Sequence, residues 1–335
     1  MLGVILSNLV PFLIVAILVV ALARARRQPL WAEAYRRLGQ NRIALAALAV
    51  IGLYGLVAIA DSVGWQNGPT APYKTVLDRV FERPPERYYS APLATMTTGE
   101  PTPHKLRGRH LLGTDGVGND VLYRTLKGCR TAIIIGGLTS LIATPLALLF
   151  GMLAGYFGKR VDDAVQYTYT VLGSIPDILL LVALLLVLGR GLVNLCIALG
   201  ITAWIGLCRL TRGETLKHRD REYVRAARAL GVGNARLLVR HILPNLLPVV
   251  IISVTLGLSG LVLSESILSY LGIGVDPGTG SWGNMIDAAR LELAREPIIW
   301  WNLASASAAL FILVLAFNIF GDALRDAIDP RLRSS

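Results

Sequence analysis

Residues 211–246, TRGETLKHRDREYVRAARALGVGNARLLVRHILPNL, form a basic stretch between two apolar runs. Nine of the chain's 33 Lys and Arg residues lie between Arg209 and His241. Residues 222–230 contain no Gly or Pro and include three alanines, so this part is expected to be a helix whose exposed face is Ala and Gly. We therefore interpret the stretch as a helical segment that another protein surface can approach closely.

The remainder of the stretch predicts a second helix. Gly231 and Gly233 are expected to end the first helix. A short helix over roughly 234–241 would follow, with Asn234 as its N-cap. Pro244 and Pro248 then mark the entry to the next apolar run. The predicted order is helix, glycine, helix and proline between two membrane spans.

The composition indicates a membrane protein. The mean hydropathy is +0.56 and only 16% of the residues are charged, which is unlike a soluble globular domain. Seven apolar runs have about the 20 residues that an α-helix needs to cross a bilayer, namely 2–22, 43–60, 132–157, 165–188, 192–210, 246–271 and 298–320. We therefore expect an all-α polytopic membrane protein with seven transmembrane helices.

The distribution of basic residues predicts the orientation. The segments 24–42, 159–163, 209–241 and 321–335 together hold 20 basic and nine acidic residues, which equals the whole formal net charge of +11. Cytoplasmic loops of membrane proteins are enriched in Lys and Arg. The basic segments and the C-terminus are therefore expected on the cytoplasmic side of the membrane, with an external N-terminus. Topology explains the charge, so nucleic acid is not an expected partner.

Three regions follow from these boundaries. Residues 1–23 are expected to form the additional N-terminal transmembrane helix, because RARR follows the apolar run instead of preceding it, unlike a signal peptide. Residues 24–110 would contain a cytoplasmic linker, a transmembrane helix and an external Pro-rich loop. Residues 111–335 would form the main transmembrane domain, with a cytoplasmic loop at 211–245. A short surface helix is also expected over 120–127.

The sequence offers little to support catalysis. It has no GxxxxGK[ST] phosphate-binding loop and no HExxH motif. Ser259 lies in a GLSG sequence, but a nucleophilic serine needs a base within reach, and none of the four histidines falls in a predicted span. The three cysteines are scattered and are expected to be small apolar fillers. His104 and His110 have no neighbouring cysteine, and no acidic partner is evident. We expect no enzyme activity, no cofactor and no metal site in this chain.

Two acidic residues lie close to the membrane. Asp177 follows Ser-Ile-Pro, and Glu265 comes late in the span after the basic stretch. Ionisable residues in such positions are candidates for a pathway or an interface. The alternatives are the first turn of a helix for Asp177, where the helix dipole favours a carboxylate, and simple interfacial placement for Glu265. Trp282, Trp300 and Trp301 are expected at the outer membrane interface.

Five blocks carry a resemblance to a known family. They are GTDGVGND (113–120), SIPDILL (174–180), EYVRAARALGVGNARLLVRHILPN (222–245), SYLGIG with SWGNM (269–285) and NIFGDALRDAIDPRLR (318–333). Together they closely resemble the C-type permease subunit of bacterial dipeptide, oligopeptide and nickel ABC importers. The third block resembles the cytoplasmic "EAA" loop of that family, which docks on the ATPase. The resemblance spans roughly residues 30–333, with the blocks in family order.

The resemblance implies a type I ABC importer permease fold and a set of partners. These are a homologous second permease, two cytoplasmic ATPase subunits that bind ATP and Mg, an external or periplasmic substrate-binding protein, and the lipid bilayer. The chain would form half of the pathway for peptides or similar small solutes. The implied ATPase-coupling residues are Glu222, Arg225, Ala226, Ala227, Gly231 and Pro244, and Arg221 and Arg228 could pair with an acidic rim.

The sequence departs from the family pattern at three points. Arg225 stands where the motif usually has an acidic residue, Asn119 replaces an arginine, and the helix at 1–23 precedes the usual six. Two other functions stay open. One is a secondary transporter or channel without ATPases, and the other is a noncatalytic scaffold whose basic loop binds an acidic partner. Such transporters usually carry several ionisable residues at mid-membrane or inverted repeats.

Overall fold

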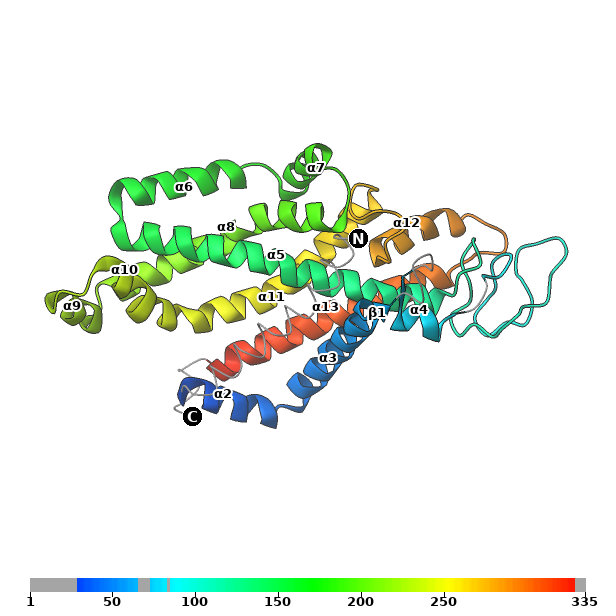
Figure 1. Cartoon of the computed structure of the whole chain (residues 1–335), viewed down its shortest axis with the longest axis horizontal. Helices are drawn as coiled ribbons and strands as arrows, with labels where there is room; N and C mark the ends of the chain where they lie inside the picture. The colour runs from blue at the N-terminus through cyan, green and yellow to red at the C-terminus, as the bar shows by residue number, and fades with distance from the viewer. Residues whose placement is uncertain (1–28, 66–72, 83–84, 329–335) are drawn as a thin grey trace.

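The computed structural model describes residues 29–65, 73–82 and 85–328 of the 335-residue chain. The expected N-terminal helix at 1–23 lies outside these residues. Long helices make up the body, and they run roughly parallel to the longest axis of the molecule (Figure 1). They are α3 (Arg42–Ser62), α5 (Val121–Phe157), α8 (Leu192–Arg219), α11 (Leu243–Tyr270) and α13 (Trp301–Ile328).

Five helices are long and apolar enough to cross a membrane, or six if one bent pair counts as a single span. This pair is α6 (Lys159–Gly173) and α7 (Asp177–Leu188), which meet at an angle of 88°. The six predicted core spans are thus found in the described part of the chain. The family's Ser-Ile-Pro sequence lies at the break, where proline cannot continue the helix of the preceding residues.

Several predicted boundaries are wrong, because helices extend beyond the apolar runs. The short surface helix predicted over 120–127 is the first part of α5, which begins after its N-cap Asp120. The basic segment 159–163, which lies outside the predicted apolar run 165–188, is the start of α6. The predicted loop at 211–245 includes the last two turns of α8 and the beginning of α11. Charged residues can extend a helix into water, so hydropathy alone does not locate its end.

The core contact is between α5 and α8. Gly151 and Gly155 lie on α5 against α8, where an added Cβ would come within 2.8 Å of the Cys208 carbonyl oxygen or 2.7 Å of the Arg212 carbonyl oxygen. Small residues allow two membrane helices to pack this closely, which confirms the packing role predicted for the pair. All three cysteines are free and buried, as expected for apolar fillers.

The loop-rich end of the molecule lies opposite to the short helix α9 (Glu222–Ala229) (Figure 1). The predicted irregular segment contains two short paired strands, β1 (Gly64–Trp65) and β2 (Lys74–Thr75), and helix α4 (Val76–Val80). Isolated bridges such as Met96–Lys105 order the rest of it. Helix α12 (Trp282–Glu292) lies toward this end too.

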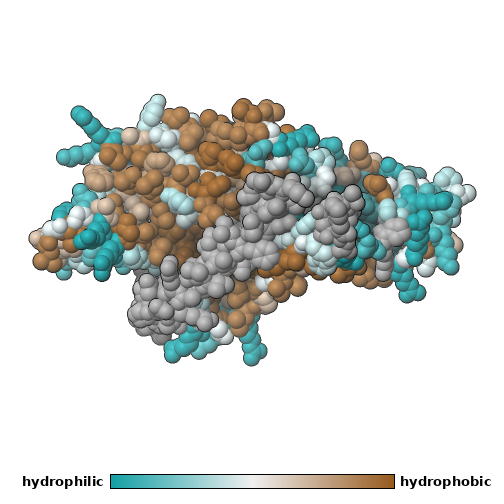
Figure 2. All heavy atoms as spheres, in the orientation of Figure 1, coloured by the Kyte–Doolittle hydropathy of each residue, from teal (hydrophilic) through white to brown (hydrophobic). Residues whose placement is uncertain are grey.

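Charge and hydropathy follow this division. Figure 2 shows hydrophobic residues over the helical body and hydrophilic residues at both ends. The described parts of the four basic segments gather toward one end, where α2 (Pro29–Gln40), the start of α6, α9 and the end of α13 lie (Figure 1). The grouping that the orientation argument assumed is therefore present in the fold.

Candidate coupling site and loop-rich surface

Gly231 ends α9 through backbone geometry that favours glycine. Its φ is +81°, in the left-handed region where a side chain is unfavourable. The Gly231 N–H donates to the Arg228 carbonyl at 3.0 Å, and the Val232 N–H donates to the Ala227 carbonyl at 3.1 Å. This is the Schellman arrangement of a helix C-terminus. A Cβ at Gly231 would have no atom within 4 Å, so bulk at this position points into open space.

One face of α9 packs on the permease body. Val224 is fully buried and Ala227 is buried with it, in a cluster that includes Tyr156, Leu237 and Ile242. The prediction that the alanines all lie on the exposed face is therefore wrong for Ala227. Two residues at this i, i+3 spacing lie on one face of a helix, and here that face anchors α9 to the body.

Arg228 also turns toward the body. Its Nη2 donates to the Tyr156 hydroxyl at 3.3 Å, and its guanidinium lies 5.5 Å from the centre of the Tyr156 ring. The same hydroxyl donates to Asn234 Oδ1 at 2.8 Å. Arg228 was predicted as a possible partner of an acidic rim, but its contacts here are with its own chain. Tyr156 on α5 thus connects α9 to the segment that follows it.

The opposite face of α9 is exposed. Ala226 and Ala229 are exposed there, and Leu230 at the end of the helix is 86% exposed. Glu222 and Arg225 are exposed at its edges. The structure thus places Glu222, Arg225, Ala226 and Gly231 on an accessible surface. We call Ala226, Ala229 and Leu230 the α9 face; Leu230 was missed in the sequence, although it lies four residues after Ala226.

The second predicted helix continues into the next span. It consists of α10 (Asn234–Arg236) and a π-helical turn, η1 (Leu237–Ile242), followed directly by α11. The prediction that Asn234 is an N-cap is wrong, since Gly233 holds that position and the Asn234 side chain accepts from Tyr156. Pro244 lies in the first turn of α11, where its missing N–H is tolerated. The segment that follows α9 is therefore continuous with the span α11.

Asp177 is the first residue of α7 and is exposed. This is the first-turn position in which the positive end of the helix dipole favours a carboxylate. The preceding helix α6 carries exposed polar residues, including Tyr167 (74% exposed), Thr168 and Thr170. The exposed side of α7 is apolar by contrast, with Leu186 and Val187 largely exposed. The break at Ser174–Pro176 therefore separates a helix with several exposed polar residues from one whose exposed residues after the first turn are apolar.

Glu265 is buried within the described part of the chain. It is 1% exposed and accepts hydrogen bonds from Ser281 at 2.6 Å, Ser269 at 2.8 Å and Ser266 at 3.3 Å. Ser281 is also the N-cap of α12. A buried carboxylate needs such donors to offset its lost hydration. Glu265 therefore fastens the start of α12 to the end of α11.

The GTDGVGND block forms a closed turn at the loop-rich end. Asp115 Oδ1 accepts from the amides of Val117 and Asn119, each at 2.9 Å, and its Oδ2 accepts from Arg124 at 2.6 Å. Asn119 also donates to Asp115 at 3.3 Å. Arg124 on α5 thus supplies a guanidinium to the carboxylate, although the block itself has lost its usual arginine.

The histidine and tryptophan side chains at the loop-rich end do not lie as the sequence predicted. The buried His110 lies 2.8 Å from Asp120 and 3.3 Å from Glu86, so it has acidic partners ten and 24 residues away. Trp282 and Trp301 are buried, and they donate to the carbonyls of Thr125 and Thr114. Only Trp300 among the three predicted interfacial tryptophans is exposed. The other two are buried donors, Trp282 to helix α5 and Trp301 to the loop at Thr114.

The described residues contain no group of three or more His, Cys, Asp or Glu side chains that could hold a metal ion. Ser259 Oγ donates to the Leu256 carbonyl at 2.8 Å and lies 2.9 Å from Asn318 Oδ1. That contact joins α11 to Asn318 of α13, the first residue of the last sequence block. A multi-pass helical membrane protein with one short helix presented at its basic end is the class that this fold and site define.

Comparison with known proteins identifies the family. Residues 147–334 match the family described as binding-protein-dependent transport system inner membrane component. The oligopeptide transport system permease protein OppC of Bacillus subtilis is 33% identical over 91% of this chain and 90% of its own. The dipeptide transport system permease protein DppC of the same organism is 30% identical over 90% of this chain and 86% of its own. An inward-facing structure of the MetNI methionine ABC transporter covers 62% of this chain and 96% of its own, at 19% identity and a TM-score of 0.48.

The chain belongs to the family of binding-protein-dependent transport system inner membrane components. It is a multi-pass inner-membrane permease subunit of an ABC importer, and it works with other subunits of that transporter. ATP-driven transport by this family depends on coupling to ATPase subunits. The resemblance seen in the five sequence blocks is thereby confirmed.

Proposed function

We propose that this chain forms half of the transmembrane pathway of a peptide importer and transmits the motion of its ATPases through α9. In this proposal it pairs with a homologous second permease. Two cytoplasmic ATPase subunits bind ATP and Mg, and an external substrate-binding protein delivers the solute. The chain itself is noncatalytic and holds no cofactor. Peptides are proposed because the relatives described above are oligopeptide and dipeptide permeases.

The observation that carries the proposal is the α9 face. A leucine that is 86% exposed, beside two alanines and outside the apolar body, is best covered by a partner. Burial of a leucine in an interface contributes about 1.5–3 kcal/mol. The neighbouring alanines permit close approach, and the exposed Glu222 and Arg225 can pair with charges at the rim. An ATPase groove that accepts a short helix fits this surface.

The inward face of α9 supplies the mechanical connection. Val224 and Ala227 pack on the body, Arg228 contacts Tyr156 of α5, and the chain runs without a break from η1 into α11. A load on α9 would therefore reach α5 and α11 together. We propose that ATP-driven closure of the ATPases tilts these spans and opens the pathway alternately to the two sides.

The orientation and the pathway follow from charge and polarity. We propose that the basic end is cytoplasmic, in accord with the positive-inside rule, and that the loop-rich end is external. The exposed polar side of α6, with Tyr167 and Thr170, is poorly suited to hydrocarbon. We place it toward the pathway between the two permeases, and the apolar exposed side of α7 toward lipid.

Co-purification and hydrolysis test the proposal together. The transporter would be prepared with a tag on this chain, comparing wild type with Leu230→Asp and the conservative Leu230→Met. We expect the aspartate variant to insert normally, lose most bound ATPase and lose substrate-stimulated hydrolysis, because a charge is buried without a partner. The methionine variant should retain both. Full ATPase binding and hydrolysis by Leu230→Asp would remove the α9 face from the docking site.

A secondary transporter or channel without ATPases is the competing function. It predicts solute uptake by this chain in liposomes without ATP. Uptake that depends on an ion gradient, and that is indifferent to ATPase subunits, would favour this alternative.

A further inference from the structure

We infer that a basic hollow at the loop-rich end binds an acidic surface group of the substrate-binding protein. The hollow has a volume of about 290 Å³ and is lined by Glu86, Arg87, Thr97, His104, Lys105 and Arg107. We call it the basic hollow. The inference rests on the proposed function, because it assumes an external loop-rich end and a binding-protein partner.

Acidic and basic side chains of the region around the hollow differ in their contacts and exposure. Within residues 85–120 there are four acidic residues and four Lys or Arg residues, so the segment is neutral overall. Its carboxylates are occupied within the chain: Asp115 by Arg124, Asp120 by His110, Glu100 by the Thr97 hydroxyl, and Glu86 by backbone amides. Arg87, Lys105 and Arg107 are exposed instead.

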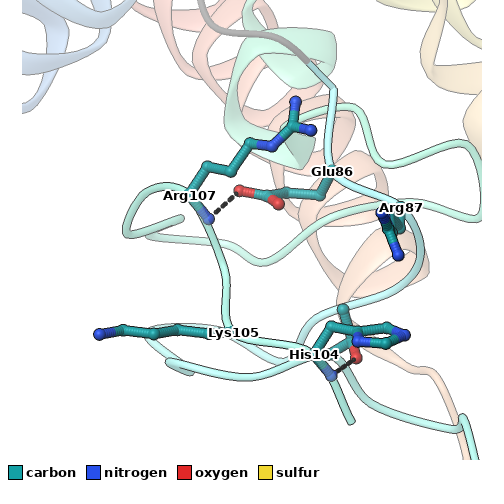
Figure 3. Close-up of a pocket in the computed structure, with 6 residues that line it drawn as sticks. Glu86, Arg87, His104, Lys105 and Arg107 are labelled. Atoms are coloured by element: carbon teal, nitrogen blue, oxygen red, sulfur yellow. Dashed lines mark hydrogen bonds between the residues drawn. The ribbon is translucent and has the colours of Figure 1, made fainter. Parts of the chain in front are cut away.

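Three of these cations lack an acidic partner in the described part of the chain. The charged groups of Arg87, Lys105 and Arg107 take part in no described salt bridge or side-chain hydrogen bond, and all three residues are exposed. They come from two neighbouring segments, 86–87 and 104–107, which both line the hollow (Figure 3). Three cations held around one small concavity create a positive potential that favours a carboxylate.

The frame beneath these cations is fixed by hydrogen bonds. The buried Glu86 accepts from the amides of Arg107 at 2.8 Å and Gly108 at 3.2 Å. The loop across the hollow is closed by Thr97, whose amide donates to the His104 carbonyl at 2.9 Å and whose hydroxyl accepts from the His104 amide at 2.8 Å. The basic side chains therefore project from an ordered backbone, which lowers the entropic cost of binding.

Position and size favour a protein side chain over a lipid or a whole peptide. The loops that form the hollow extend beyond the hydrophobic body to the tip of the molecule (Figures 1 and 2). A lipid headgroup would lie next to that body instead. The volume of 290 Å³ is at the lower limit of small-molecule sites, so it accommodates one or two carboxylate groups but not an enclosed peptide. The binding protein approaches from this end.

The test uses the complete transporter in nanodiscs of uncharged lipid, with its binding protein as the mobile partner in an interferometry experiment. The variant Lys105→Glu/Arg107→Glu reverses two charges, and the milder Lys105→Gln/Arg107→Gln guards against misfolding. The control is Arg190→Glu, another exposed arginine. It lies beside Gly191, whose amide bonds to Gly274 outside the hollow.

We expect the charge-reversal variant to associate at least about tenfold more slowly at low salt, since rim charges act mainly on association rates. The neutral variant should show a smaller loss, and the differences should shrink at high salt because of screening. Arg190→Glu should associate within about twofold of wild type.

Two results would overturn the inference. One is association of the charge-reversal variant within about twofold of wild type. The other is unchanged association with a selective loss of uptake for acidic peptides, which would assign the hollow to the solute. If wild type itself shows no coupled hydrolysis and no binding-protein association, the proposed function fails instead. If wild type shows coupled hydrolysis and the variants associate with the binding protein as wild type does, only the role of the basic hollow is refuted.

Discussion

The two ends of the helical body are stabilised in different ways. At the loop-rich end, buried carboxylates such as Asp115 and Glu265 each accept several hydrogen bonds and tie distant segments together. At the α9 end, Val224 and Ala227 supply apolar packing, and Arg228 and Tyr156 supply one polar connection. The outward surfaces differ too: the apolar Leu230 is exposed at the α9 end, and the cations Arg87, Lys105 and Arg107 are exposed around the basic hollow at the other end.

This difference indicates a division of labour. Satisfied buried polar groups make a region rigid, and they are costly to disturb. A short helix held by a small apolar face can be displaced as a unit, and it passes the displacement to the helices it contacts. The loop-rich end is thus suited to hold a fixed shape, and the α9 end is suited to transmit movement. The following substitutions test this contrast, from the largest expected effect to the smallest.

Removal of Asp115 should destabilise the loop-rich end most. Asp115→Ala leaves Arg124 without its 2.6 Å partner and removes the acceptor of two turn amides. Breaking a largely buried ion pair typically costs about 3–5 kcal/mol. We expect a strong fall in the thermal unfolding temperature of the purified protein. The unfolding temperature of Asp115→Asn, which keeps an acceptor, should fall less. Equal stability of Asp115→Ala and wild type would contradict the rigid role of this turn.

Glu265 should contribute less, because its partners are neutral serines. Glu265→Leu would leave the hydroxyls of Ser269 and Ser281 without their buried acceptor. An unsatisfied buried polar group costs about 1–3 kcal/mol. We expect a moderate decrease in thermal stability and faster proteolysis of the loop before α12. Glu265→Gln retains an acceptor and serves as the control. A pathway role would instead show as normal stability with lost uptake.

Arg228 should affect coupling more than stability. Arg228→Ala removes the contact with Tyr156 at the α9 end, which is worth about 1 kcal/mol as a partly exposed hydrogen bond and cation–π pair. ATPase binding should persist while stimulated hydrolysis and uptake become partly uncoupled. Arg225→Ala is the matched control on the outward side. Loss of ATPase binding in Arg228→Ala would show that this arginine contacts the partner after all.

Glu292 on α12 should produce the smallest effect, seen as a dependence on pH. Burial raises the pKa of this carboxyl, and a hydrogen bond from Asn302 at 3.1 Å opposes the shift. A carboxyl with a raised folded-state pKa contributes stability that is present below its unfolded pKa and is lost as the pH rises through the folded value. Glu292→Gln should therefore reduce the fall in unfolding temperature between pH 4 and pH 8. An unchanged slope would contradict this assignment.

Much of the architecture could be predicted from the sequence because apolar length has a direct physical meaning. The six core spans, the end of α9 at Gly231 and the close contact at Gly151 and Gly155 all follow from local rules about hydropathy and small residues. Those rules do not locate where a helix stops once it leaves the membrane. The charged turns at the end of α8 and at the beginning of α6 therefore lie outside the predicted apolar runs.

The site was harder to predict because its contacts join residues far apart in the sequence. Which alanine of α9 is buried depends on Tyr156 and Leu237, and neither lies in the helix. The serines around Glu265 include Ser281, and His110 finds Glu86 from 24 residues away. The local sequence pattern predicted helix α9 and its candidate docking residues, but only the fold shows which of those residues face outward.

Hydrolysis by the complete transporter with a substitution at Gly231 tests the central claim most directly. Gly231→Trp adds bulk into open space beside the α9 face, and Gly231→Asn is the control because asparagine tolerates a positive φ. The account predicts that the tryptophan variant inserts normally but loses ATPase docking and substrate-stimulated hydrolysis, while the asparagine variant keeps most of both. Unchanged hydrolysis and uptake with tryptophan at this position would contradict coupling through α9 and would favour transport without ATPases.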